Sequence, residues 1–136
     1  VKPGTSLAAI HAEVVKCLTT GLVELGLLTG SLEEELNATN YQKFFMHGTG
    51  HWLGLDVHDA GSYLINGEAR PLEVGMVFTI EPALYIQAAD TSVSEEWRGI
   101  GIRIEDNILV TATGAEVLTS QVPKELEEIE NLIGKL

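Results

Sequence analysis

Cysteine, basic side chains and long apolar runs are all scarce in this chain of 136 residues. Cys17 is the only cysteine, so an internal disulfide is excluded, and its place in an apolar helical pattern predicts a buried, unreactive thiol. No apolar run approaches the roughly 20 residues that span a bilayer, and no signal peptide is visible. We therefore expect a cytoplasmic protein without a transmembrane helix.

The shortage of basic residues also bears on partners. Eight Lys and Arg residues stand against 20 Asp and Glu, which leaves a net charge of −12. Proteins that bind nucleic acid or anionic membranes draw on clustered Lys and Arg side chains to contact phosphate. We therefore expect neither a nucleic-acid partner nor a membrane partner, and solubility is the simplest role for the acidic surface.

The first third of the chain has the spacing of helices. Apolar residues at three- and four-residue steps predict an amphipathic helix over residues 6–25, with these inward side chains: Leu7, Ile10, Val14, Leu18, Leu22 and Leu25. Ser6 or Thr5 suits its start and Gly26 its end. Ser31 and Glu34 have the spacing of a capping box, which predicts a second, shorter helix.

After residue 44 the pattern changes to short apolar runs between Gly, Asn, Asp and Pro residues, which is typical of strands and turns. We predict strands over 76–81, 83–86, 100–105, 107–111 and 116–118. Pro123 suits the first turn of a closing helix, whose expected inward residues are Leu126, Ile129, Leu132, Ile133 and Leu136. One α+β domain over residues 1–136 accounts for this order of elements.

Three of the four histidines, His47, His51 and His58, lie within twelve positions of one another among several glycines. Gly48 and Gly50 disfavour a regular helix there and let the backbone approach a ligand closely. A single histidine is usually a structural residue, whereas this clustering favours a metal or acid–base site. Both interpretations remain open on the histidines alone.

Two glutamates add possible oxygen ligands. Glu81 ends an apolar strand and Glu105 lies among three isoleucines, and burying an unpaired carboxylate costs several kcal/mol, so each should be paired, protonated or metal-bound. Arg103 either pairs with a carboxylate of the protein or binds one of a substrate. Imidazole with carboxylates suits Mn, Fe, Co or Zn, and carboxylates can bridge two ions, although one ion needs only His51 and the glutamates.

Three blocks of sequence carry a resemblance to a known family: residues 45–59, 72–82 and 98–106. In order and spacing they resemble the C-terminal part of the catalytic domain of pita-bread metallopeptidases. Within these the Xaa-Pro aminopeptidase (aminopeptidase P) family is most similar, and prolidase and methionine aminopeptidase are more distant. The resemblance implies a partial pita-bread (creatinase/aminopeptidase-like) fold, in which helices flank a curved antiparallel sheet.

The resemblance also implies residue roles. His51, Glu81 and Glu105 would be metal ligands for two divalent ions, with Glu105 bridging them; manganese is the expected metal, and zinc, cobalt and iron are alternatives. His47 and His58 would bind the substrate and stabilise the reacting carbonyl, and Arg103 would order the substrate end of the site. Water activated by the ions would attack the carbonyl, with Glu81 handling the proton.

The implied activity is release of the N-terminal residue from peptides with proline in second position, by a protein that is a homo-oligomer at full length. Two other functions stay open: an Xaa-Pro dipeptidase (prolidase), and a pita-bread module that binds peptides or partners without catalysis. An unrelated metal-binding β-barrel would need ligands at strand spacing such as His-x-His, which the chain lacks.

Two departures from the family pattern matter. The family's two aspartate ligands lie upstream of the matched region, and this chain's aspartates are at positions the motif does not use: Asp56, Asp59, Asp90 and Asp106. Residues 1–4 read like an interior linker, so we expect an excerpt of a longer protein. Because the two aspartate ligands are missing, we expect weak or absent metal binding. We also expect negligible peptidase activity, or self-association through an exposed apolar face. The second departure is Ala83, which stands where the family usually has glycine after Glu-Pro; this is a mild change at a turn.

Overall fold

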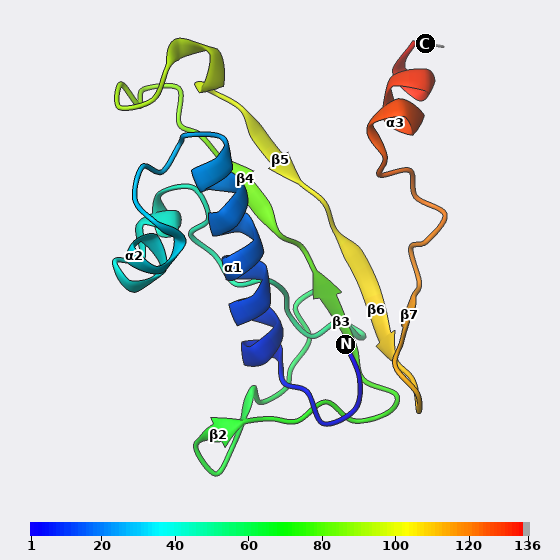
Figure 1. The fold of residues 1–136 in the computed structure, drawn as a ribbon. Helices are drawn as coiled ribbons and strands as arrows, with labels where there is room; N and C mark the ends of the chain where they lie inside the picture. Colours follow the sequence, from blue (N-terminus) through cyan, green and yellow to red (C-terminus); the bar gives the residue numbers. More distant parts are fainter. Residues whose placement is uncertain (135–136) are drawn as a thin grey trace.

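A computed structural model describes residues 1–134, in which two helices pack on one side of a long, bent antiparallel ribbon (Figure 1). The helices are α1 (Leu7–Glu24), α2 (Leu32–Asn37) and α3 (Leu126–Ile133), with 3-10 turns η1 (Asn40–Lys43) and η2 (Glu95–Trp97). The strands are β1 (Leu64–Ile65), β2 (Glu68–Ala69), β3 (Val77–Ile80), β4 (Ala83–Tyr85), β5 (Gly101–Arg103), β6 (Asp106–Val110) and β7 (Ala115–Val117). This arrangement confirms the predicted α+β class.

Helix α1 confirms the predicted first helix and its caps. The Ser6 side chain accepts a hydrogen bond from the Ala9 amide, and Gly26 takes a left-handed φ of 71° after the last turn. Its fully buried face is formed by Val15, Thr19 and Leu22.

Two expectations about this helix were wrong. Leu25 is 50% exposed, because it caps the helix at its end. Cys17 is exposed because it lies two residues from both Val15 and Thr19, so about 200° of helical rotation points it away from the buried face.

Helix α2 has the predicted capping box. The Ser31 side chain accepts a hydrogen bond from the Glu34 amide, and the Glu34 side chain accepts one from the Ser31 amide.

The closing helix differs from prediction in two ways. It begins only after Glu125, so Pro123 lies outside it. Its expected inward residues are exposed, because α3 stands apart from the ribbon (Figure 1). The exposed fractions are 71% for Leu126, 39% for Ile129, 53% for Leu132 and 66% for Ile133. Leu136, the last residue of the predicted stripe, lies outside the described residues.

The ribbon consists of two sheets in the orders β3-β6-β7 and β4-β5, and every pairing is antiparallel. The predicted strands are confirmed within a few residues at their ends. Pro82 interrupts the first long strand between β3 and β4, as predicted, and the registers on either side pair Ile80 with Asp106 and Ala83 with Arg103. The two registers continue each other without a shift across Pro82. At the junction the Ile104 amide donates a hydrogen bond to the Pro82 carbonyl (3.2 Å).

Two clusters of buried apolar side chains join the helices to the ribbon. One lies beneath the C-terminal half of α1 and consists of Leu22, Leu28, Phe44, Ile86 and Val93. The other lies against β3 and β6 near the start of α1 and consists of Trp52, Leu72, Phe78, Ile108 and Val110. Helix α1 is therefore anchored at both ends, which fixes its position beside β3.

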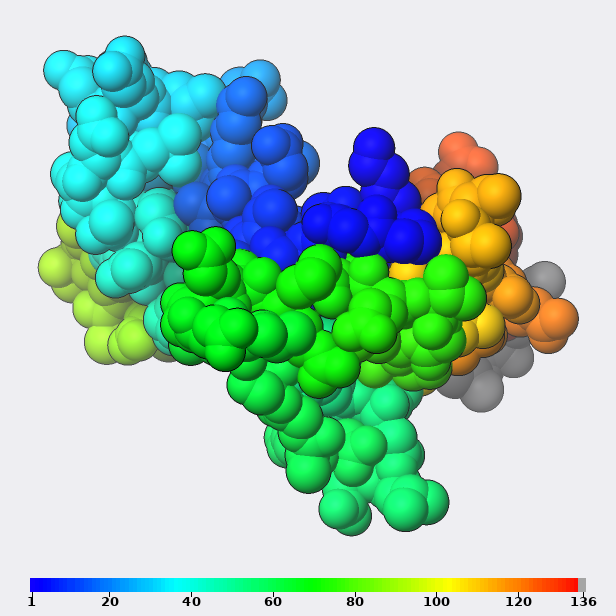
Figure 2. Space-filling model, turned by 90° about the horizontal axis from the view of Figure 1, so that it is seen from below, coloured from blue at the N-terminus to red at the C-terminus, as the bar shows by residue number. Residues whose placement is uncertain are grey.

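Two further features complete the fold. Strands β1 and β2 form a hairpin that the sequence analysis missed, although its turn residues Asn66 and Gly67, at φ of 52° and 84°, are a strong hairpin signal. The segment after His51 projects from the body and leaves Leu55 fully exposed (Figure 2). Among residues 1–134 we find no helix with the length and apolarity needed to span a bilayer.

Candidate metal centre

The break in the ribbon brings the two candidate glutamates together. Because the registers of β3-β6 and β4-β5 are in phase across Pro82, Glu81 lies opposite Glu105 in the gap between the strands. Directly opposed residues of an antiparallel pair have side chains on the same face. The two carboxylates therefore face the same side of the ribbon, although 24 positions separate them in the sequence.

A short extended segment, residues 49–53, carries His51 to the same place. It runs antiparallel along the free edge of β3: Thr79 donates to the His51 carbonyl at 2.9 Å, and Glu81 donates to the Thr49 carbonyl at 2.7 Å. The contact is close, since a Cβ atom at Gly50 would lie 1.8 Å from the Thr79 carbonyl oxygen. His51 is thus paired with Thr79, and its side chain shares the face that carries Glu81.

The imidazole of His51 has a defined orientation. Its Nδ1 lies 3.0 Å from the Trp52 carbonyl, and because a carbonyl only accepts, Nδ1 carries the proton and donates. Nε2 then faces Glu81 Oε1 at 3.2 Å. A lone pair and a carboxylate oxygen repel each other at this distance unless a proton or a cation lies between them.

These donors fit a metal ion. One ligand atom from each of His51, Glu81 and Glu105 lies within 4.8 Å of the others. With metal–ligand bonds of about 2.1 Å, neighbouring ligands of one ion are about 3.0 to 3.4 Å apart, which matches the separation of Nε2 and Oε1. The carbonyl that holds Nδ1 is the kind of outer partner that metal-binding histidines usually have.

Glu81 has the partners that a buried carboxylate requires. The residue is buried, with 8% of its surface exposed. In addition to its contact with His51, the carboxylate accepts a hydrogen bond from the Thr79 hydroxyl (3.0 Å) and lies 3.3 Å from Arg103 Nη1. The same Thr79 oxygen accepts a hydrogen bond from the His51 amide at 3.0 Å. Thr79 therefore links two ligand residues. Of the three states expected for Glu81 (paired, protonated or metal-bound), the structure shows the paired one, whereas Glu105 is exposed and the predicted burial there was wrong.

A hydrogen-bonded chain extends from this carboxylate toward His47. The Tyr85 hydroxyl accepts from Arg103 Nε at 3.0 Å and Nη2 at 2.6 Å, and lies 3.3 Å from His47 Nε2. His47 Nδ1 donates to the Gly48 carbonyl, so its Nε2 is free to accept the Tyr85 proton. The hydrogen bond to Tyr85, helped by Glu81 and Glu105, raises the pKa of Arg103 above its ordinary value.

His58 lies at the open side of the group. It is exposed, and its ring meets that of His51 edge to face with centroids 4.3 Å apart. The structure thus groups His51, Glu81 and Glu105 and connects the other three predicted site residues to them: Arg103 contacts Glu81, His58 contacts His51, and His47 is linked to Arg103 through Tyr85. Arg103 pairs with a carboxylate of the protein itself, which was one of the two alternatives.

Two of the aspartates lie in other pairings. The candidate ligand group found among residues 1–134 contains no aspartate. Hydrogen bonds from Lys43 and Ser92 lower the pKa of Asp90 to about 2, and Asp106 pairs with Lys124 at 2.7 Å. These two carboxylates are committed to structural pairs.

Sequence reasoning missed three residues around the centre: Thr79, Tyr85 and Thr49. Alternation along β3 was a usable signal for Thr79, because a residue two before Glu81 must share its face. No local signal marked Tyr85 or Thr49, whose partners lie in distant segments.

Comparison with known proteins agrees with this geometry. The profile described as "Metallopeptidase family M24" matches residues 1–112. The Xaa-Pro aminopeptidase of Escherichia coli is 53% identical over 132 residues, which cover 97% of this chain and 30% of that protein. This chain thus spans about 30% of the length of such relatives.

Solved structures show the same fold. The chain superposes on aminopeptidase PepP of Pseudomonas aeruginosa with a TM-score of 0.96 and 49% identity, over 99% of this chain and 30% of that one. It superposes on E. coli aminopeptidase P, solved with the inhibitor Pro-Leu, with a TM-score of 0.91 and 51% identity, over 98% of this chain and 30% of that one. The predicted partial pita-bread fold is confirmed.

Proposed function

The chain belongs to metallopeptidase family M24, and from this premise we propose that residues 1–136 form the C-terminal portion of the catalytic domain of an Xaa-Pro aminopeptidase. The proposed reaction is release of the N-terminal residue from peptides whose second residue is proline. One observation carries the proposal: His51 Nε2 and Glu81 Oε1 face each other at 3.2 Å beside Glu105, an arrangement that a cation stabilises.

Three residues would hold the metal: His51, Glu81 and Glu105. The family resemblance implies two divalent ions, which these three residues would help to hold, and manganese as the expected metal; imidazole with carboxylates suits zinc, cobalt and iron as well, so these are the alternatives. When bound, the metal would polarise the peptide carbonyl and make water a better nucleophile. The family resemblance implies two further aspartate ligands, so the three residues named here are proposed as part of a five-ligand set.

The proposal also gives Glu81 and the remaining predicted residues roles in moving protons and binding the substrate. Glu81, held by Arg103 and Thr79, keeps its carboxylate at the ligand group, where it can take a proton from the attacking water. His58 is exposed next to His51 and offers a donor to the reacting carbonyl. Tyr85 couples His47 to Arg103, which orients both side chains at the substrate end.

Partners and location belong to the same proposal. The relatives' name, Xaa-Pro aminopeptidase, supports a peptide with proline in second position as the substrate, and the Pro-Leu inhibitor of E. coli aminopeptidase P corresponds to the part of such a peptide that follows the cleaved bond. A homo-oligomer at full length, without nucleic-acid or membrane partners, and a cytoplasmic location are proposed with it.

The decisive experiment is a chimera. Replacing the matching part of E. coli Xaa-Pro aminopeptidase with this chain should give an enzyme that cleaves an Xaa-Pro-Yaa tripeptide in the presence of Mn²⁺. Glu81→Gln in the chimera should abolish turnover, whereas Glu116→Gln, on exposed strand β7, should leave it unchanged. A folded chimera that binds the peptide without cleaving it would favour the non-catalytic module, and cleavage of Xaa-Pro dipeptides alone would favour the dipeptidase.

The chain by itself gives a second test. With three of the five ligands we expect weak metal binding and negligible hydrolysis of the same tripeptide, since a bridged pair of ions needs the missing carboxylates. Turnover by the isolated chain comparable with that of the E. coli enzyme would contradict this expectation.

A further inference from the structure

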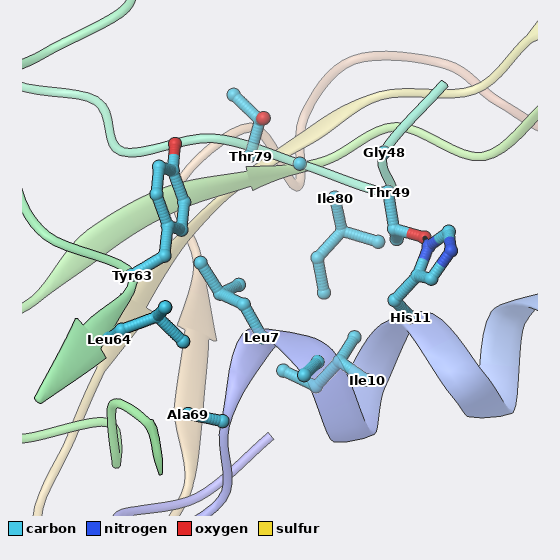
Figure 3. A pocket seen from close by; sticks show the side chains of 12 residues that line it. Leu7, Ile10, His11, Gly48, Thr49, Tyr63, Leu64, Ala69, Thr79 and Ile80 are labelled. Carbon is cyan, nitrogen blue, oxygen red and sulfur yellow. Dashed lines mark hydrogen bonds between the residues drawn. The ribbon is translucent and has the colours of Figure 1, made fainter. Parts of the chain in front are cut away.

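The fourth histidine, His11, lies outside the histidine-rich motif but contacts the segment that carries His51. It projects from α1, and its Nδ1 lies 2.7 Å from the Thr49 hydroxyl oxygen, 38 residues away in the sequence. Figure 3 shows the two side chains meeting at one end of the pocket between α1 and β3. Thr49 is only 5% exposed, so this hydrogen bond joins a helix to a buried residue beside the metal centre.

Thr49 is the point at which the His51 segment joins β3. Its carbonyl accepts from the Glu81 amide (2.7 Å), and the next pairs along are those of His51 with Thr79. Gly48 and Gly50 flank it, and glycine permits many backbone conformations. Backbone pairing holds the segment on its β3 side, and the Thr49 hydroxyl holds it on its α1 side.

His11 is well suited to hold a fixed position. It lies on a long helix whose neighbouring residues Leu7 and Ile10 pack against the cluster beneath β3. Its ring is 5.9 Å from that of Phe45, which is 1% exposed. Burial, with the positive charge that His47 can carry, lowers the pKa of His11, which keeps the ring neutral near pH 7.

We propose that the His11–Thr49 hydrogen bond is a positioning contact for the metal centre: it fixes the start of the 49–53 segment and thereby the place of His51 relative to Glu81. The backbone part of this inference concerns the chain alone. The part that concerns the ion rests on the proposed function.

Amide hydrogen exchange on the metal-free chain tests the positioning role directly. Thr49→Val keeps the shape of the side chain and removes the hydroxyl, and His11→Ala removes the ring. Each should speed exchange at the Glu81 and His51 amides by about three- to tenfold, which corresponds to one lost hydrogen bond. The Gly75 and Val110 amides, at the far end of the same sheet, should change by less than about twofold.

Matched variants separate this contact from general destabilisation. Thr49→Ser keeps the hydroxyl and His11→Asn keeps a side-chain N–H donor, so both should exchange like the parent chain. The double variant His11→Ala/Thr49→Val should exchange no faster than either single one, because both remove the same bond. Uniform acceleration across the sheet, additive effects, or equal exchange of Thr49→Ser and Thr49→Val would overturn the proposal. If Thr49→Val proves too unstable, the two His11 variants give the same comparison.

A metal titration then tests the link to the site. Isothermal titration of the chain with Co²⁺ should show about tenfold weaker binding for Thr49→Val and His11→Ala, with Thr49→Ser unchanged. Unchanged affinity in all variants would overturn the link to the ion. If the parent chain by itself binds no Co²⁺, the same titration on the chimera with these variants decides the link to the ion, and the exchange result still decides the positioning contact.

Discussion

Thr79 shows how much can depend on one hydroxyl group. It is 1% exposed, donates to Glu81 Oε1 and accepts from the His51 amide. Thr79→Val leaves both groups without that partner, so we expect the free energy of unfolding to fall by about 1 to 3 kcal/mol and the affinity for Co²⁺ to fall by about tenfold. Urea denaturation and isothermal titration measure the two effects.

The control for this prediction is Thr79→Ser, which keeps the oxygen and loses only a methyl group. It should retain the affinity of the parent chain for Co²⁺ and lose less stability than the valine variant. Equal loss of affinity in both variants would show that packing at this position, and not the hydroxyl, matters for the site.

His11 gives a prediction for pH. Because burial and the nearby His47 lower the pKa of His11 in the folded chain below its ordinary value of 6.5, the unfolded chain binds the proton more readily. Its contribution to stability is therefore complete above pH 6.5 and is lost as the pH falls through the lowered value. Urea midpoints measured from pH 7.5 to 5 should fall more steeply for the parent chain than for His11→Asn, and parallel curves would contradict this.

At the scale of single elements, local spacing predicted existence and type well. The capping box of α2, both caps of α1 and the break at Pro82 all depend on residues within four positions of one another, and the structure has each of them. Which side of a helix is buried was predicted less well. Leu25 and the apolar stripe of α3 are exposed. An apolar stripe is buried only where the fold places another element against it, and the spacing within a helix does not determine that placement.

Helix α1 permits a direct test of this distinction. Leu22 and Leu25 belong to the same predicted stripe, but Leu22 is fully buried and Leu25 is 50% exposed. Leu22→Ala should lower the free energy of unfolding by about 2 to 5 kcal/mol, because it leaves a cavity in the cluster below the helix. Leu25→Ala should cost about 0.5 kcal/mol or less. Similar costs in urea denaturation would show that the predicted stripe, and not the observed burial, is correct.

At the scale of the whole molecule, the described residues expose a broad apolar surface. A groove lined almost wholly by apolar atoms runs along β4 and β5, and Ile100, Ile102 and Ile104 on its wall are 38%, 61% and 48% exposed. Contiguous apolar surface of this kind promotes association. It matches the expectation that an apolar face is open in this chain.

We therefore expect the chain to self-associate at micromolar concentrations. Ile102→Lys, in the groove, should shift sedimentation velocity profiles toward monomer, whereas Val122→Lys, which is 53% exposed outside the groove, should not. A chain that sediments as a monomer at all concentrations, or equal effects of the two variants, would contradict this expectation.

The sequence by itself determined most of the helices and strands, the candidates His51, Glu81 and Glu105, and the resemblance to the family, because these depend on residue types at particular spacings along the chain. Only the tertiary structure decided which side chains meet. Thr79 binds both Glu81 and the amide of His51, which is 28 positions away from it, Tyr85 joins Arg103 to His47, and His11 reaches Thr49 from another element. Such contacts are set by packing and strand register over the whole domain: alternation along β3 places Thr79 on the face of Glu81, but no local pattern in the sequence records which distant segments meet.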